Sequence, residues 1–321
     1  MSKGEKIWMI VAAALVALGA LLFAVAMMVA GWDFSKLGTE DIITNTYQAE
    51  TAFTQISIEE DTAKIDILPA DDGVCRVVCQ ERKKMPHTVE VAQDTLVIRL
   101  TDTRKWYEYI GISFGKTEVT VYLPETEYDR LTVETDTGDI TVSDAFVFET
   151  INISADTADI ESRADVVTSV NVATSTGDIR LEDVTLGQAN LATDTGNVWA
   201  ERIETKGKLG FATDTGDLCM TDVHCGALEL ESSTGNKHLV RVTVDGTLTA
   251  RSSTGNVTFE NSDAAALSVE TSTGNVSGSL RSEKVFITDS ATGRINVPKT
   301  VKGGRCEITT STGNIDISLL N

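Results

Sequence analysis

The chain has 321 residues and carries 48 Asp and Glu against 27 Lys and Arg, a formal net charge of −21. This balance excludes an ordinary nucleic-acid-binding protein, because phosphate binding needs a basic face that displaces counterions. The 41% hydrophobic residues and 4 prolines indicate an ordered chain rather than a disordered acidic tail. With 5 cysteines, 3 histidines and no paired CxxC or HExxH motif, the sequence predicts no cofactor, no metal site and no disulfide framework.

Residues 7–31 form an uncharged apolar run that follows Lys3 and Lys6. As a helix with a rise of about 1.5 Å per residue, this run is longer than the ~30 Å hydrocarbon core of a bilayer. By the positive-inside rule, the preceding lysines keep residues 1–6 in the cytoplasm. We therefore expect a single-pass protein of the cell membrane, with a transmembrane helix over 7–31 and an extracytoplasmic remainder.

A cleaved signal peptide is the alternative for this segment, because Ala24-Val25-Ala26 resembles a cleavage site. The apolar part of a signal peptide has only about 7–15 residues, and this longer run favours an anchor. Residues 32–50 have weak periodicity and several polar side chains, so they are expected to form a linker.

A corner motif, Thr-Gly followed in most copies by Asp or Asn, recurs every 19 or 20 residues over 131–321. A strict period of this length is typical of solenoids, in which each unit stacks on the next. Glycine accepts backbone conformations with positive φ, so the corner is expected to be left-handed, a region that Asn and Asp tolerate next best. The ten motifs centre on Gly138, Ala158, Gly177, Gly196, Gly216, Gly235, Gly255, Gly274, Gly293 and Gly313.

Apolar or small residues alternate with polar ones on both sides of each corner. In the first copy they are Leu131, Val133, Thr135, Ile140 and Val142. Steps of two predict strands whose alternate side chains face inward, and such short units bury their apolar face only by stacking. The sequence therefore predicts an all-β protein, a single-stranded parallel β-solenoid of ten 19–20-residue coils with an expected right-handed path, preceded by one transmembrane helix.

Residues 51–130 follow the same alternation less regularly. They are interpreted as the beginning of the same solenoid, with longer coils that cap its end and a protruding insertion over 101–118. A separate small β-domain is the alternative.

The segments Val119–Tyr128 and Leu131–Ile140 together resemble the entry to the bacterial putative-adhesin β-strand-repeat family. This resemblance covers residues 45–321 and rests on the Leu-Pro strand, the Tyr and the run of Thr-Gly-Asp/Asn corners. Members carry a domain of unknown function, often behind one transmembrane helix, and some accompany cell-envelope stress operons. The resemblance implies a β-solenoid outside the cytoplasm and brings no catalytic residues with it.

The acidic corners admit two further interpretations. Asp-Thr-Gly at Asp136, Asp194 and Asp214 matches the aspartic-protease tripeptide, but such enzymes need two of these carboxylates across one cleft. Here Asp-Thr-Gly is one sequence variant of the repeated corner, which has Ser-Thr-Gly in other copies. Stacking would also bring Asp139, Asp159 and Asp178 close together, where Ca²⁺ could relieve their repulsion. Solvated carboxylates without calcium are the favoured interpretation.

Two apolar surfaces are the candidate binding sites. The insertion holds the densest aromatic cluster outside the apolar run, with Trp106, Tyr107 and Tyr109. Plain packing of this insertion over the solenoid is the alternative. The last strand ends in Leu319 and Leu320 without a charged edge, which favours pairing with a partner or a second copy. The five cysteines are expected to be free, structural thiols.

These features favour a non-enzymatic surface scaffold or adhesin-like binding module, with a possible link to envelope stress. Its partner would be the membrane, through the helix, and an unknown envelope protein or glycan. A self-assembling solenoid that associates end to end is the alternative. A carbohydrate-active β-helix enzyme is less favoured, because it needs carboxylates clustered on one face.

Overall fold

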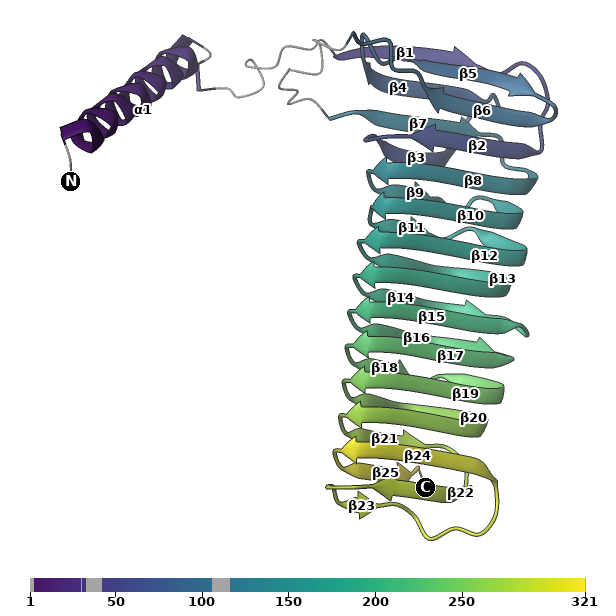
Figure 1. Ribbon diagram of the computed structural model, residues 1–321. Coiled ribbons are helices and arrows are strands. Elements are labelled where there is room, and N and C mark those ends of the chain that lie inside the picture. Colours follow the sequence, from purple (N-terminus) through teal and green to yellow (C-terminus); the bar gives the residue numbers. More distant parts are fainter. Residues whose placement is uncertain (1–2, 30, 33–41, 106–115, 321) are drawn as a thin grey trace.

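The computed structural model describes residues 3–29, 31–32, 42–105 and 116–320. It contains one helix, α1 (Lys3–Val29), and a long stack of strands (Figure 1). Within α1, the segment Lys6–Val29 has a mean hydropathy of 2.7 and is long and apolar enough to cross a membrane. The strands are β1 (Ile42–Gln48), β2 (Gln55–Glu60), β3 (Lys64–Pro69), β4 (Arg76–Arg82), β5 (His87–Ala92), β6 (Thr95–Leu100), β7 (Glu118–Leu123), β8 (Glu127–Thr137), β9 (Ile140–Val142), β10 (Val147–Thr157), β11 (Ile160–Ser162), β12 (Asp165–Thr176), β13 (Ile179–Thr195), β14 (Val198–Glu204), β15 (Lys208–Thr215), β16 (Leu218–Cys225), β17 (Ala227–Thr234), β18 (Lys237–Val240), β19 (Thr243–Thr254), β20 (Val257–Thr273), β21 (Val276–Leu280), β22 (Lys284–Ser290), β23 (Ile295–Asn296), β24 (Gly304–Thr312) and β25 (Ile315–Leu319).

The repeat region is a parallel β-solenoid of about ten coils, which confirms the predicted fold class. Each coil has one strand before its Thr-Gly corner and one after it. Successive coils pair in register, so that Leu131 of β8 lies beside Ile151 of β10, and Ile140 of β9 beside Ile160 of β11. The 19–20-residue period thus places equivalent residues in continuous rows.

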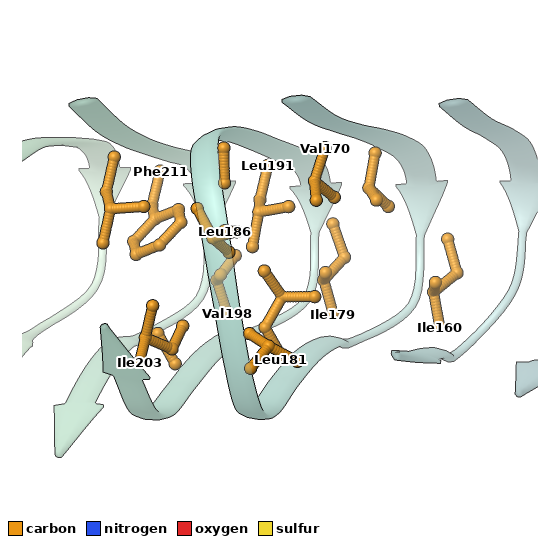
Figure 2. Packing of buried hydrophobic residues seen from close by; sticks show 14 of the residues in the cluster. Ile160, Val170, Ile179, Leu181, Leu186, Leu191, Val198, Ile203 and Phe211 are labelled. Atoms are coloured by element: carbon orange, nitrogen blue, oxygen red, sulfur yellow. The ribbon is translucent and has the colours of Figure 1, made fainter. Parts of the chain in front are cut away.

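The inward rows form one hydrophobic cluster that runs the length of the solenoid. Figure 2 shows Ile160, Ile179 and Val198 following one another along one row, with Val170, Leu191 and Phe211 on the opposite side of the interior. The alternation of apolar and polar residues predicted these positions, because side chains on a strand point alternately to the two faces.

The corner glycines are required mainly because neighbouring corners touch. Gly255 has φ +147°, and a Cβ built there would lie 1.9 Å from the carbonyl oxygen of Gly235 in the adjacent coil. The same contact recurs at Gly177, where the Cβ would lie 1.9 Å from the oxygen of Ala158. The predicted positive φ is confirmed at both glycines, although their backbone is more extended than the left-handed helical value of about +57°.

The left-handed conformation occurs instead at a second corner that the sequence did not reveal. Asp183, Arg202, Asp222 and Arg241 have φ between 53° and 56° and follow one another along the stack. Their side chains pair between coils: Arg202 with Asp183, and Arg241 Nε with Asp222 Oδ1 at 2.5 Å. These exposed pairs add little energy individually, but they line one edge of the rod with alternating charges.

The residue after each corner glycine belongs to a hydrogen-bonded ladder. The side-chain oxygen of Asn236 accepts the backbone N–H of Asn256 at 3.1 Å, and that of Asn256 accepts the N–H of Asn275 at 2.8 Å. Asn275 in turn accepts the N–H of Asn314 at 2.7 Å, and Asn314 that of Arg294 at 2.9 Å. The preference for Asp and Asn after glycine therefore reflects contacts between coils.

The N-terminal strands extend the same sheet, first with parallel and then with antiparallel pairing. β2 and β3 pair in parallel with β8 and β9, so that Ile56 lies beside Leu131 and Ile65 beside Ile140. β6 and β7 stack on β2 and β3 in parallel. β5 and β4 then add in antiparallel orientation, and β1 pairs with β4 as the outermost strand. We call β1, β4 and β5 the cap.

At the other end, the order of coils in space differs from their order in the chain. β24 and β25, the last strands in the sequence, lie between β20 and β21 on one side and β22 and β23 on the other. The ladder follows this order, because Asn314 bridges Asn275 and Arg294. The free end of the solenoid is therefore formed by β22 and β23 rather than by Ile315–Leu319, as sequence order had suggested.

Candidate functional site

A cluster of buried polar side chains lies under the cap. Glu60 comes from the end of β2, Cys79 and Glu81 from one face of β4, and His87 from the start of β5. All four are buried, and the side chains of Glu60, Glu81 and His87 are each at most 2% exposed. Glu60 pairs with Thr135, so it occupies the inward row that threonine and serine fill in later coils.

The imidazole of His87 is held between two carboxylates. Its Nδ1 lies 2.5 Å from Glu81 Oε2, and its Nε2 lies 2.5 Å from Glu60 Oε2. The backbone N–H of His87 also donates to Glu81 Oε2 at 2.6 Å. Burial disfavours the charged imidazolium, but hydrogen bonds to Cys79 and Glu60 outweigh it and raise the pKa of His87 to about 10.

Two side chains of the outermost strand complete this cluster. Asn45 Nδ2 donates to Glu81 Oε1 at 2.5 Å, and the Tyr47 hydroxyl donates to the carbonyl of His87 at 3.0 Å. Burial, together with the nearby Glu81 and Cys79, raises the pKa of Tyr47. Each strand of the cap thus contributes at least one member of the network, so the cluster joins the cap to the first coils.

The second candidate is the free edge at the opposite end, made of β22, β23 and the segment 297–303. Ile295 belongs to an inward row but is 41% exposed, because β23 is the last strand there among the described residues. Val285, Ile287 and Val301 are also exposed large apolar side chains. An unpaired strand edge with exposed apolar groups is a natural site for association.

The binding residues expected from the sequence have different positions. Trp106, Tyr107 and Tyr109 lie outside the described residues. Leu319 is half-buried against the core, and Leu320 is exposed, next to β21 rather than at the free edge. The aromatic surface therefore stays a prediction, and Leu319 and Leu320 do not form the free edge.

The acidic corners lie on the outside of the solenoid. Asp194 and Asp214 are exposed, on neighbouring coils of an open surface. Oδ1 of Asp139 and of Asp159 each accept the backbone N–H of the next corner, at 3.2 and 2.8 Å. One oxygen of each carboxylate is thus already engaged in the ladder, and the expectation of solvated carboxylates without calcium stays a prediction.

A family model described as Toastrack DUF4097 matches residues 53–212 and 203–321, which together span most of the chain. The chain belongs to this family. The resemblance recognised from the Leu-Pro strand and the repeated corners is thereby confirmed. No curated protein matches the chain.

Several solved structures resemble this Toastrack chain at low sequence identity. A "putative adhesin" from Bacteroides fragilis is 14% identical, with 87% of this chain and 97% of that chain covered and a TM-score of 0.37. A "putative lipid binding protein" from Parabacteroides distasonis is 12% identical, with 88% and 98% covered and a TM-score of 0.44. A "putative adhesin" from the same species is 11% identical, with 87% and 98% covered and a TM-score of 0.46.

All five cysteines lie in the described part of this Toastrack chain and are free thiols. Cys75, Cys225 and Cys306 are buried in apolar surroundings, and desolvation raises the pKa of each to about 11 or 12. These three are therefore inert structural thiols. Cys79 differs, because its sulfur lies among a carboxylate and an imidazole. From the sequence, Cys79 is expected to be one of five structural thiols, and Glu81 and His87, which the turn between β4 and β5 brings to the same sulfur, are missed.

Proposed function

We propose that this protein is a membrane-anchored, extracytoplasmic scaffold that binds a partner through the free edge of β22 and β23 and has no enzymatic activity. The apolar helix α1 supports the anchoring, since its length and composition suit a bilayer. The lysines at its N-terminal end support a cytoplasmic N-terminus. A role in envelope stress is part of this proposal and rests on the family resemblance alone.

The observation that carries the binding role is the exposed apolar edge. Val285, Ile287 and Ile295 are 38%, 47% and 41% exposed, on strands whose other edge pairs with β24 and β25. Parallel and antiparallel partners can add to such an edge through backbone hydrogen bonds, while side chains supply selectivity. The solenoid then serves as a rigid spacer between the bilayer and the bound partner.

The charge of this end indicates the kind of partner. Residues 281–305 contain 6 basic and 2 acidic residues, although the whole chain carries −21. Lys299 and Lys302 are exposed in the segment beside the edge. Two such ends would repel each other, so an acidic envelope protein or glycan fits better than a second copy in end-to-end contact.

The test compares two substitutions of exposed apolar residues. Ile287→Lys places a charge on the free edge, whereas Val167→Lys makes the same change on β12, where Val167 is 66% exposed in the middle of the solenoid. Full-length variants are chemically cross-linked in intact native envelopes. We expect the partner adduct to disappear for Ile287→Lys only. Equal adducts for both variants and the parent would show that the lateral faces bind.

Self-association is the second candidate function, favoured by the unpaired edge of β22. Sedimentation of the full chain in detergent distinguishes the two. A dimer or fibre that Ile287→Lys converts to monomers would support self-assembly, whereas a monomeric parent with an Ile287-dependent adduct supports the partner-binding role. Membrane fractionation, with mass analysis of the mature N-terminus, tests the anchor, and an N-terminus near Gly31 would contradict it.

A further inference from the structure

The strongest unassigned feature is the buried cluster under the cap. Its ligand-type atoms are the sulfur of Cys79, a carboxylate oxygen of Glu81 and a ring nitrogen of His87, all within 4.8 Å of one another. All three residues are buried. Sulfur, imidazole nitrogen and carboxylate oxygen are the three donor types that Zn²⁺ takes in proteins, and structural zinc sites are closed to solvent.

The positions of Cys79, Glu81 and His87 on β4 and β5 bring their donor atoms close together. Cys79 and Glu81 are two residues apart on β4, so both side chains leave the same face of the strand. The short turn after Arg82 brings the first residue of β5, His87, back beside them. The ring nitrogen nearest to Glu81 is Nδ1, at 2.5 Å from Oε2.

The surrounding residues support the orientation that a metal ligand needs. Glu60 Oε2 lies 2.5 Å from His87 Nε2 and can accept the N–H of that nitrogen, so that Nδ1, which faces Glu81, is the nitrogen that would give up its proton to a metal ion. A carboxylate on the far nitrogen of a ligating histidine is a recurrent feature of metal sites. Asn45 donates to Glu81 Oε1 and so fixes the orientation of that carboxylate.

We propose that Cys79, Glu81 and His87 bind a divalent transition-metal ion of the Zn²⁺ type, with Glu60 as a positioning residue behind His87. Binding requires a thiolate and an unprotonated Nδ1, so Cys79 and His87 Nδ1 each release one proton to solvent when the ion binds. The ion would fasten β4 and β5 of the cap to each other. In the metal-free chain the same residues form a closed hydrogen-bonded network, which is the alternative that the experiment must separate.

The experiment uses the full chain in detergent, stripped with a chelator and dialysed against Zn²⁺ with Mg²⁺ in excess. Metal analysis of the dialysed protein is expected to give one zinc per chain. Cys79→Ser and His87→Gln should lower the affinity at least tenfold. Glu60→Gln should lower it roughly 10–100-fold while the stoichiometry stays at one, as expected when the group that orients a ligand is lost.

Matched controls identify the site. Cys75→Ser changes the other buried cysteine of the N-terminal region, and His224→Ala removes a half-buried histidine that lies between Glu204 and Asp245. Both variants should bind zinc like the parent. If Cys79→Ser and Cys75→Ser bind equally well, or if the parent binds no zinc, the proposal is overturned.

Cobalt provides a readout that does not depend on a variant folding. Co²⁺ bound to a cysteine thiolate gives a sulfur-to-metal charge-transfer band in the near ultraviolet, and the parent chain should show it. Its absence on saturation with Co²⁺ would rule out Cys79 as a ligand. The band should persist in Cys75→Ser, and far-ultraviolet circular dichroism of each variant confirms that the solenoid is folded.

Discussion

The ammonium group of Lys237 donates a hydrogen bond of 2.5 Å to Ser232 Oγ inside the solenoid. Lys237 is fully buried and lies in an inward row between Leu218 and Val257, both of which are apolar. Desolvation lowers its pKa from 10.5 to about 8, although Asp217 and Glu231 act in the opposite direction. A charged lysine therefore interrupts the apolar interior at one coil.

Replacing Lys237 with methionine should stabilise the protein. The lowered pKa means that burying the ammonium costs free energy below pH 8, so Lys237→Met should raise the free energy of unfolding at pH 7 by up to roughly 3 kcal/mol. Thermal unfolding of the full chain, followed by circular dichroism of the β signal, measures this change. Lys206→Met, at an exposed lysine, is the control and should have little effect.

The same lysine predicts a pH dependence. Between pH about 8 and 10.5 the unfolded chain binds the Lys237 proton and the folded chain does not, so the contribution of this group makes stability rise with pH over that interval. Subtracting the Lys237→Met profile from that of the parent isolates this contribution. A difference that is flat across this interval would show that Lys237 is not desolvated in the folded state.

Substitutions at two glycines with positive φ, Gly255 and Gly73, should have very different effects on stability. At Gly255 any Cβ would meet the Gly235 oxygen at 1.9 Å, so Gly255→Ala and Gly255→Asn should both destabilise by several kcal/mol or prevent folding. At Gly73 φ is +69° and nothing lies within 4 Å of a Cβ, so Gly73→Asn should cost less than about 1 kcal/mol. Chemical denaturation of the variants measures both, and a well-tolerated Gly255→Asn would mean that the corners are not in contact.

The repeat period, the inward positions and the need for glycine could all be predicted from the sequence, because they depend on local alternation and on a fixed spacing. The burial of Lys237 could not be predicted, because an inward row is identified from its apolar residues. A single lysine in the sequence is normally expected to be exposed. The second corner was also missed, because Asp183 and Arg202 adopt the left-handed conformation without a glycine, and the one asparagine of this row, Asn261 with φ 49°, comes only after Arg241.

The candidate sites were harder to predict because they depend on contacts between distant segments. Glu60 meets His87 only after β6 and β7 have stacked on β2 and β3 and the chain has reversed in the cap. The free edge was misplaced because the exchange of β22 and β24 leaves the 19–20-residue period unchanged. Spacing defines which residues stack, but it does not define the order in which equal coils stack.

The Asn/Asp ladder predicts a selective effect of isosteric changes. Asn256→Leu removes the oxygen that accepts the N–H of Asn275 at 2.8 Å, which should cost about 1–2 kcal/mol. Asn256→Asp keeps this acceptor and should cost less. Denaturant unfolding of both variants provides the measurement, and equal losses would mean that the side-chain amide, rather than its oxygen, stabilises the corner.

The order of the last coils leads to a prediction about deletions. Removing residues 198–217 joins Asn197 to Leu218, which pairs with Val198 in the intact chain, so one complete coil is lost and the register is preserved. In a linear array the two flanking coils can then stack directly. We expect a shorter rod that still unfolds cooperatively.

Ending the chain at Gly303 removes β24 and β25, which are terminal in sequence but internal in space. β20 and β21 then lose their neighbours on one side, and β22 and β23 lose the strands with which they pair. This truncation deletes 18 residues, compared with the 20 of the internal deletion, yet it should destabilise the protein more and expose apolar surface to a hydrophobic dye. Dye binding and the midpoint of thermal unfolding, measured side by side for the two deletions, test this ranking. If the truncated chain is as stable as the internal deletion and binds no more dye, β22 and β23 must be able to stack directly on β20 and β21, and the exchanged order is not required.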